Sequence, residues 1–147
     1  MMRTYQYWLV AAFFVASIVR SGNAQKVTIQ SYVQHTVMGI QKGFGIRSKL
    51  KKGFEVGVAH QANMFSRSEL LNQRYPFTGA EVLVPISQGA RMQLYFNTKT
   101  GFVNKHFFAV LPEVESRVKI ARRIHLGFGA GIRAGQASSS FKILLDL

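Results

Sequence analysis

The feature that most constrains this chain is a strict two-residue alternation of side-chain type. Between Arg123 and Ala134, every second residue is apolar, and the residues between them are charged, polar or glycine. Successive side chains of a β-strand point to opposite faces, so a period of two predicts a strand with two different faces. One face is wholly apolar, and the other is polar or carries no side chain.

The glycines of this segment also fit a nucleotide-binding fingerprint. Gly129, Gly131 and Ala134 match the spacing G-x-G-x-x-G/A. That motif is meaningful only between a strand and a helix, within a βαβ unit of about 30 residues. The chain ends at Leu147, which leaves no room for the helix and second strand. The alternation therefore explains these glycines better than a dinucleotide site does.

The same alternation recurs along most of the chain. We predict eight strands, at residues 26–36, 38–50, 53–65, 76–88, 90–101, 105–119, 122–135 and 137–147. Helices are disfavoured because β-branched and aromatic residues dominate and glycine interrupts nearly every segment. The one helix-like patch, Ser66–Gln73, is predicted to be a loop, with one helical turn at most. The predicted fold class is all-β.

The N-terminal residues predict export. An apolar run from Trp8 to Val19 follows a short segment that carries Arg3 and no acid, and the small residues Gly22–Ala24 follow the run. This is the layout of a cleaved secretory signal peptide at 1–24, with a barrel domain at 25–147. The alternative is an uncleaved anchor helix. No later segment approaches the ~20 apolar residues of a membrane helix, and cysteine is absent.

The lengths of the links between the predicted strands indicate how they are connected. The links after the second, fourth and sixth segments are tight, whereas the link after the third is long (66–75). Short turns at one end and longer loops at the other are typical of an up-and-down antiparallel barrel in an outer membrane, with periplasmic termini. The links after the first and seventh segments are also short, so the fit is imperfect.

The polar face has the composition of a barrel interior. It is rich in glycine, which would leave room for long side chains in a narrow eight-stranded lumen. Its acidic residues lie beside arginines that include Arg47. Buried charges persist only when they are paired, so we predict a structural charge network in the lumen. Its predicted members are Glu55, Glu81, Glu113, Glu115, Arg91, Arg117, Arg123 and Arg133. A solvated face with scattered charges is the alternative.

The C-terminal segment carries a family resemblance. Phe141, Ile143, Leu145 and Leu147 alternate to the last residue. In this the chain resembles small outer-membrane β-barrels of the OmpA/OmpX type, whose C-terminal strand is read by the barrel-assembly machinery. The last residue of the best-known members is aromatic, and here it is Leu147. The resemblance implies an eight-stranded transmembrane barrel in the outer membrane of a double-membraned bacterium.

Two prolines interrupt predicted strands. Pro112 lies in the middle of 105–119, and a closed barrel has no edge to tolerate a missing backbone donor, so we predict a β-bulge there. Pro85 lies near a turn and is less disruptive.

The net charge of +13 indicates an anionic partner. Because the chain is predicted to be exported, we expect outer-membrane lipids, lipopolysaccharide or another envelope subunit rather than nucleic acid. The basic residues concentrate around two tight turns. This rim could simply be solvated and snorkelling, or it could contact anionic lipid or a periplasmic partner. Its members are Lys49, Lys51, Lys52, Lys119, Arg122 and Arg123.

No pattern in the sequence indicates catalysis. The histidines, at positions 35, 60, 106 and 125, lack the spacing of a metal pair, so neither metal nor cofactor is expected. The function expected is that of an integral outer-membrane barrel with a filled lumen and a structural or accessory-subunit role in an envelope complex. The alternatives are a soluble periplasmic barrel that binds an apolar ligand and a barrel lipid hydrolase or acyltransferase. The lipocalin G-x-W motif is missing, since the only tryptophan is Trp8.

Overall fold

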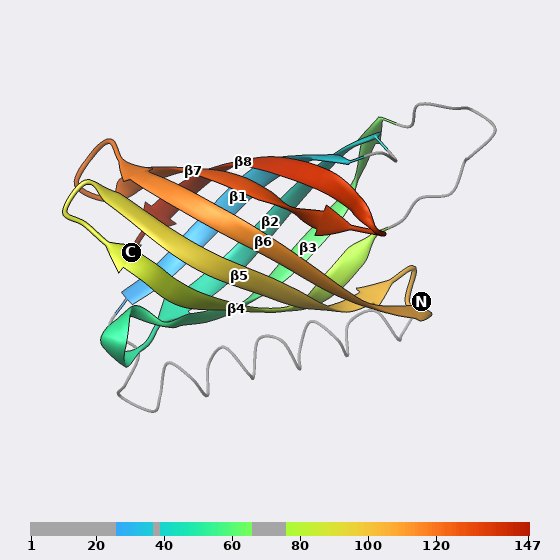
Figure 1. The fold of residues 1–147 in the computed structure, drawn as a ribbon, viewed down its shortest axis with the longest axis horizontal. Coiled ribbons are helices and arrows are strands. Elements are labelled where there is room, and N and C mark those ends of the chain that lie inside the picture. The colour runs from blue at the N-terminus through green and yellow to red at the C-terminus, as the bar shows by residue number, and fades with distance from the viewer. Residues whose placement is uncertain (1–25, 37–38, 66–75) are drawn as a thin grey trace.

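The protein forms a closed barrel of eight antiparallel strands, each paired with its neighbours in sequence (Figure 1). The computed structural model describes residues 26–36, 39–65 and 76–147. The strands are β1 (Lys26–Thr36), β2 (Gly39–Lys49), β3 (Glu55–Phe65), β4 (Phe77–Gln88), β5 (Met92–Val103), β6 (Phe107–Lys119), β7 (Ile124–Arg133) and β8 (Gln136–Asp146). The predicted eight-stranded up-and-down barrel is confirmed. The predicted signal peptide at 1–24 and the predicted loop at 66–73 lie outside the described residues.

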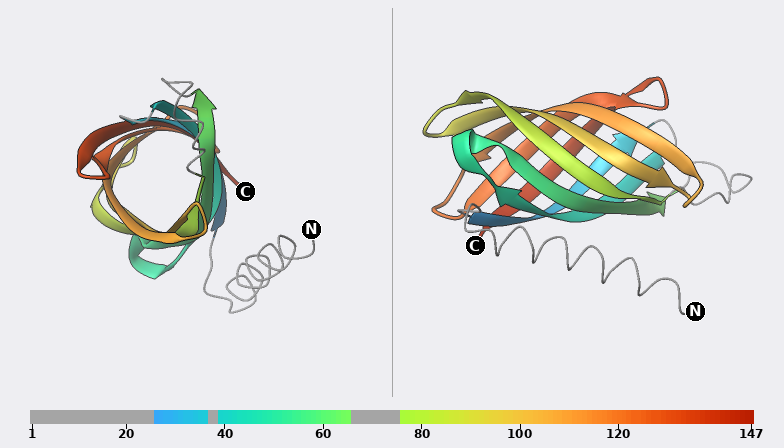
Figure 2. Two further views of the ribbon diagram at one scale, coloured as in Figure 1. Left: turned by 90° about the vertical axis from the view of Figure 1, so that its right-hand side faces the viewer. Right: turned by 90° about the horizontal axis from the view of Figure 1, so that it is seen from below.

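Pairing of the first strand with the last closes the barrel. β1 pairs with β2 on one side and with β8 on the other, from Thr28 opposite Asp146 to His35 opposite Ser139. Seen along its axis, the sheet forms a complete ring (Figure 2). Closure pairs every strand on both sides, which leaves no open sheet edge.

The three links predicted to be tight gather at one end of the barrel, where the C-terminus also lies, but the links 104–106 and 134–135 at the other end are just as short (Figure 1). A short 3-10 turn, η1 (Lys51–Gly53), joins β2 to β3, and Lys52 and Gly53 adopt positive φ angles of 61° and 81° there. Residues 89–91 join β4 to β5, and residues 120–123 join β6 to β7. We refer to this as the tight-turn end. Among the described residues there is no helix of the length and apolarity needed to cross a membrane.

The predicted bulge at Pro112 is wrong. β6 stays in register with β5 through Pro112, which lies opposite Thr98. The pairing of β6 with β7 ends at Glu113 opposite Gly131. The carbonyl of Pro112 faces Gly131, so its nitrogen also points towards β7, where the ladder stops. The proline therefore lies where the β6–β7 ladder ends, and its missing donor ends that pairing rather than shifting the register of β6. Register shifts occur instead at Ile40/Gln41 and at Pro85/Ser87.

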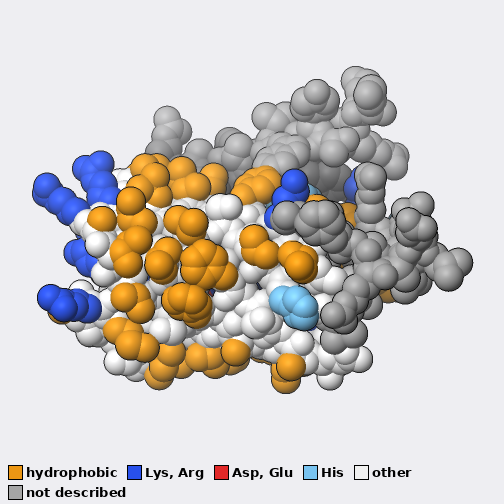
Figure 3. Space-filling model, turned by 90° about the horizontal axis from the view of Figure 1, so that it is seen from above, with side chains coloured by type: hydrophobic (Ala, Val, Ile, Leu, Met, Phe, Trp, Pro, Cys, Tyr) orange, Lys and Arg blue, Asp and Glu red, His pale blue; other side chains and the backbone are white. Residues whose placement is uncertain are grey.

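The two faces of the sheet have opposite chemistry. Large apolar side chains are exposed on the outer surface, while the buried side chains are mostly polar or charged. In the view of Figure 3, apolar side chains cover the middle of the barrel, and lysines and arginines gather at the tight-turn end. Exposed apolar residues from all around the barrel include Ile29, Phe44, Val82, Phe96, Val114, Phe128, Phe141 and Leu145.

Candidate functional site

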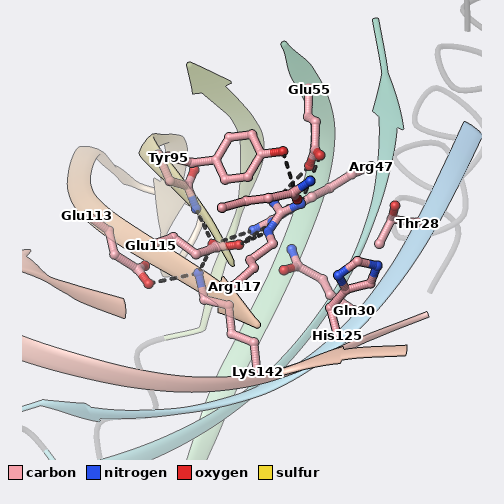
Figure 4. Close-up of polar contacts among 12 residues, drawn as sticks. Thr28, Gln30, Arg47, Glu55, Tyr95, Glu113, Glu115, Arg117, His125 and Lys142 are labelled. Carbon is pink, nitrogen blue, oxygen red and sulfur yellow. Dashed lines mark hydrogen bonds and ion pairs between the residues drawn. The ribbon is translucent and has the colours of Figure 1, made fainter. Parts of the chain in front are cut away.

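The centre of the lumen is organised around Arg47 of β2. Its Nε donates to Glu81 Oε1 at 2.7 Å, and its Nη1 donates to Glu115 Oε1 at 2.8 Å. Nη2 reaches the second oxygen of each carboxylate at 3.1 Å. The side chains of all three residues are fully buried. One guanidinium thus joins β2 to β4 and β6 through the interior, and Figure 4 shows its contact with Glu115.

A second arginine extends this network towards the tight-turn end. Arg117 of β6 forms two hydrogen bonds of 2.8 Å with the carboxylate of Glu55 on β3. Its Nε also donates to Glu115 at 2.6 Å. The guanidinium carbon lies 4.3 Å from the ring centre of Tyr95, a cation–π contact. Arg117 therefore has two carboxylates and an aromatic face as partners.

Two lysines complete the set. Lys142 of β8 contacts Glu115 and lies 2.7 Å from Glu113 Oε1. Lys99 of β5 lies 3.5 Å from Glu113 Oε2 and 4.3 Å from the ring centre of Tyr32. Ser140 also donates to Glu113 at 2.5 Å. Every carboxylate of the network therefore has at least one cationic partner.

Charge in this network is balanced. Four buried glutamates meet four buried cations, and together they form the lumen network: Glu55, Glu81, Glu113, Glu115, Arg47, Lys99, Arg117 and Lys142. An unpaired ion in a low-dielectric interior costs several kcal/mol, so pairing is a condition for this interior to be stable. The network uses four of the six acidic residues of the chain.

Glycines make room for these side chains. A Cβ on Gly57 would lie against Arg47, and a Cβ on Gly129 would overlap the Glu113 carboxylate and the Ser140 hydroxyl. A Cβ on Gly43 would overlap the ring of Tyr32. This is the physical reason for the glycine-rich face that includes the apparent dinucleotide fingerprint.

The rest of the described lumen holds uncharged side chains and one further cation. Gln61 donates to Gln34 at 3.0 Å and to Gln41 at 2.5 Å, and it accepts a hydrogen bond from Tyr32 at 3.1 Å. Arg133 donates to Gln41. Phe77, Leu83 and Leu144 are fully buried. Side chains thus occupy the lumen along much of its length, as the small diameter of an eight-stranded barrel requires.

The structure divides the predicted network into residues inside the lumen and residues outside it. Glu55, Glu81, Glu113, Glu115 and Arg117 meet in the interior, and all of them except Glu81 are labelled in Figure 4. Arg133 is buried but bonds to Gln41, because it lies at the other end of the barrel from Glu55. Arg91 and Arg123 are exposed. Each immediately precedes a strand, where the alternation no longer decides which way a side chain points.

Three cations of the network were not among its predicted members, although the sequence pattern places Arg47 on the same face as the glutamates. Arg47, Lys99 and Lys142 are all buried and paired. Each falls on the polar face by simple alternation, so the parity of the strand was a sufficient signal for all three.

Histidines form two polar pairs. His60 Nδ1 lies 2.7 Å from the Thr78 hydroxyl on the outer surface, and His125 Nε2 lies 3.2 Å from Asp146 Oδ2 at the tight-turn end. Among the described residues there is no group of three or more histidine, cysteine or acidic side chains that could hold a metal ion. Neither pair includes a serine nucleophile.

Comparison with solved structures identifies the same architecture elsewhere. A designed transmembrane β-barrel superposes with a TM-score of 0.66 at 10% identity, covering 84% of this chain and 97% of the design. The N-terminal β-barrel domain of Pseudomonas aeruginosa OprF gives a TM-score of 0.65 at 8% identity, covering 85% and 99%. Yersinia pestis outer membrane protein Ail, solved in a phospholipid bilayer nanodisc, gives 0.52 at 6% identity, covering 83% and 99%.

These similarities establish the fold alone, because the sequence identities are so low. The shared architecture is an eight-stranded barrel of the kind found in outer membranes. No model of a known protein family matches the chain, and no curated protein sequence matches it either.

Proposed function

We propose that this chain is an integral protein of a bacterial outer membrane, of the small OmpA/OmpX-like type, with a structural or accessory-subunit role in an envelope complex. In this proposal, residues 1–24 are a signal peptide that is removed on export. The tight-turn end faces the periplasm, and the apolar outer surface meets lipid. Lipids, lipopolysaccharide and other envelope subunits are the expected partners.

The observation that carries the proposal is the inverted distribution of polarity. A water-soluble barrel buries its apolar face and exposes charge, whereas a membrane barrel does the reverse. Here Glu115, Arg47 and Lys142 are fully buried, and Phe128 on the outer surface is 52% exposed. A belt of exposed apolar side chains of this extent is a liability in water. In lipid it is the surface required for insertion.

The lumen supports a role without solute transport. A pore needs a continuous aqueous path, and buried, paired charges in the middle of the lumen argue against one, because separating such pairs is costly. The same network disfavours the alternative of a soluble barrel that binds an apolar ligand, because the side chains that line the interior are predominantly polar. The barrel then contributes a rigid membrane-embedded body rather than a channel or a catalyst.

Fractionation tests the proposal. The native chain should fractionate with outer membranes, resist extraction by carbonate or urea, and migrate differently on a gel before and after boiling. The purified barrel should give no steady ion current in a planar bilayer. Recovery as a fully soluble periplasmic protein would refute membrane insertion. A stable conductance would refute only the closed lumen.

A further inference from the structure

The tight-turn end contains a basic pocket that shares only Glu55 and Arg117 with the lumen network. It has a volume of about 140 Å³ and opens at the mouth of the barrel. We call it the vestibule. Six lysines and arginines line it, together with His125 and only two acids, Glu55 and Asp146. The six are Lys26, Lys49, Arg91, Arg117, Lys119 and Arg122.

The two acids of the vestibule already have partners. Glu55 receives two hydrogen bonds from Arg117, and Asp146 accepts one from Thr28 at 2.7 Å and contacts His125. Among the described residues, no acidic side chain forms an ion pair with the five other cations of the pocket. The vestibule therefore carries an excess of positive charge, while the network above it is neutral.

The backbone holds these like charges close together. Lys26, the first residue of β1, lies directly opposite Lys49, the last residue of β2. The amide of Lys119 donates to the carbonyl of Arg91 at 2.9 Å, which makes these two residues neighbours across β5 and β6. Like charges in directly opposed positions destabilise a sheet. A bound anion would convert this repulsion into attraction.

We propose that the vestibule is a binding site for a phosphate group with two or more negative charges, of the kind found in phosphate monoesters and diphosphates. Arginine guanidinium groups match tetrahedral oxyanions through paired N–H donors, and lysines supply compact charge. A vestibule of about 140 Å³ has room for several water molecules and therefore for a phosphate group. A singly charged carboxylate would leave more of the excess uncompensated.

Titration calorimetry tests the site in a non-ionic detergent, with inorganic pyrophosphate as the probe at low ionic strength. The variant Arg91→Gln/Arg122→Gln should bind pyrophosphate at least about ten-fold more weakly, because charge-assisted hydrogen bonds are lost. The matched control is Lys51→Gln/Lys52→Gln, which removes the same charge from the same end but outside the vestibule lining. It should change the affinity by less than about two-fold, the effect of screened long-range charge.

Equal weakening in the two double variants would overturn the proposal, since it would indicate general attraction to a basic rim. Absence of saturable binding to the wild-type barrel would also overturn it. Unfolding supplies an independent readout. Pyrophosphate should raise the unfolding midpoint of the wild type, and Lys49→Gln should raise the midpoint without ligand while reducing the shift with ligand. A lower midpoint in Lys49→Gln would contradict the repulsion argument.

Nanodiscs distinguish the two sources of phosphate. If a lipid headgroup is the ligand, phosphatidic acid in the disc, whose headgroup is a phosphate monoester, should compete with pyrophosphate, whereas phosphatidylcholine alone should not. If the ligand is free in solution, the affinity should be the same in both discs. The site itself does not depend on the proposed membrane location, because the calorimetric measurement is made in detergent.

Discussion

Arg47 and Glu115 are joined by two hydrogen bonds, of 2.8 and 3.1 Å, although they lie on opposite sides of the barrel. Arg47 belongs to β2 and Glu115 to β6, four strands apart in a ring of eight. The pair therefore crosses the lumen and ties the two halves of the sheet together. Strand pairing alone does not connect β2 with β6, because the two strands are not neighbours in the sheet.

Loss of the Glu115 carboxylate should be strongly destabilising. Glu115→Gln removes the carboxylate that Arg47, Arg117 and Lys142 share, so one positive charge in the lumen is left without a counter-charge. Breaking a buried ion pair in this way costs about 3–5 kcal/mol. Urea unfolding of the refolded barrel measures the change. Arg123→Gln, at an exposed position, is the control and should shift stability by less than about 0.5 kcal/mol. An unchanged midpoint for Glu115→Gln would mean that water screens the lumen charges.

The Arg47–Glu115 pair should show coupling in a double-mutant cycle. Arg47→Gln and Glu115→Gln each leave an uncompensated charge, whereas the double variant removes both members of the pair. We expect it to be less destabilised than the sum of the single variants by about 0.5–3 kcal/mol, the range for residues in one network. Strict additivity would argue against a direct interaction.

Phe128→Arg should impair insertion into lipid. Phe128 lies in the middle of β7, on the outer surface, and packs against Phe141 at a ring distance of 5.3 Å. An arginine near the bilayer midplane costs about 2–4 kcal/mol, and one near the interface costs at most about 1 kcal/mol. Ile120→Arg, in a tight turn, is therefore the matched control. Equal folding yields in lipid vesicles would mean that this face does not meet the hydrocarbon core.

Gly129→Leu should destabilise the barrel from within. The new side chain would displace the Glu113 carboxylate and the Ser140 hydroxyl, and overpacking typically costs about 1–3 kcal/mol. The adjacent change Ala130→Leu adds bulk on the exposed face, where it should be tolerated. If Ala130→Leu were the more disruptive of the two, the assignment of the faces would be reversed.

Pro112→Ala should be nearly neutral. The nitrogen of Pro112 points to the end of the β7 ladder, so a restored N–H adds at most one terminal hydrogen bond to that strand. We expect a change in unfolding free energy within about 0.5 kcal/mol. A stabilisation above about 1 kcal/mol would indicate that the proline does interrupt a ladder bond.

The sequence alone determined the strands and their two faces. Alternation is a local property of an extended chain, because neighbouring side chains must point to opposite sides. That is sufficient to place Glu113, Glu115 and Arg117 on the face opposite Val114 and Val118 without any knowledge of the fold. The tight turns also carry local signals, such as the paired lysines at Lys51 and Lys52.

Only the tertiary structure decided which charges meet. The cationic partners of Glu115 come from β2, β6 and β8. Their positions along the barrel axis depend on strand tilt and on the register of every intervening strand pair. Arg123 is close to Glu115 in the chain but lies outside the lumen, while Arg47 is 68 residues away and bonds to it directly. The alternation along a strand determines which face of the sheet a side chain lies on. Closure of the barrel fixes its neighbours, because closure brings together strands that share no hydrogen bonds.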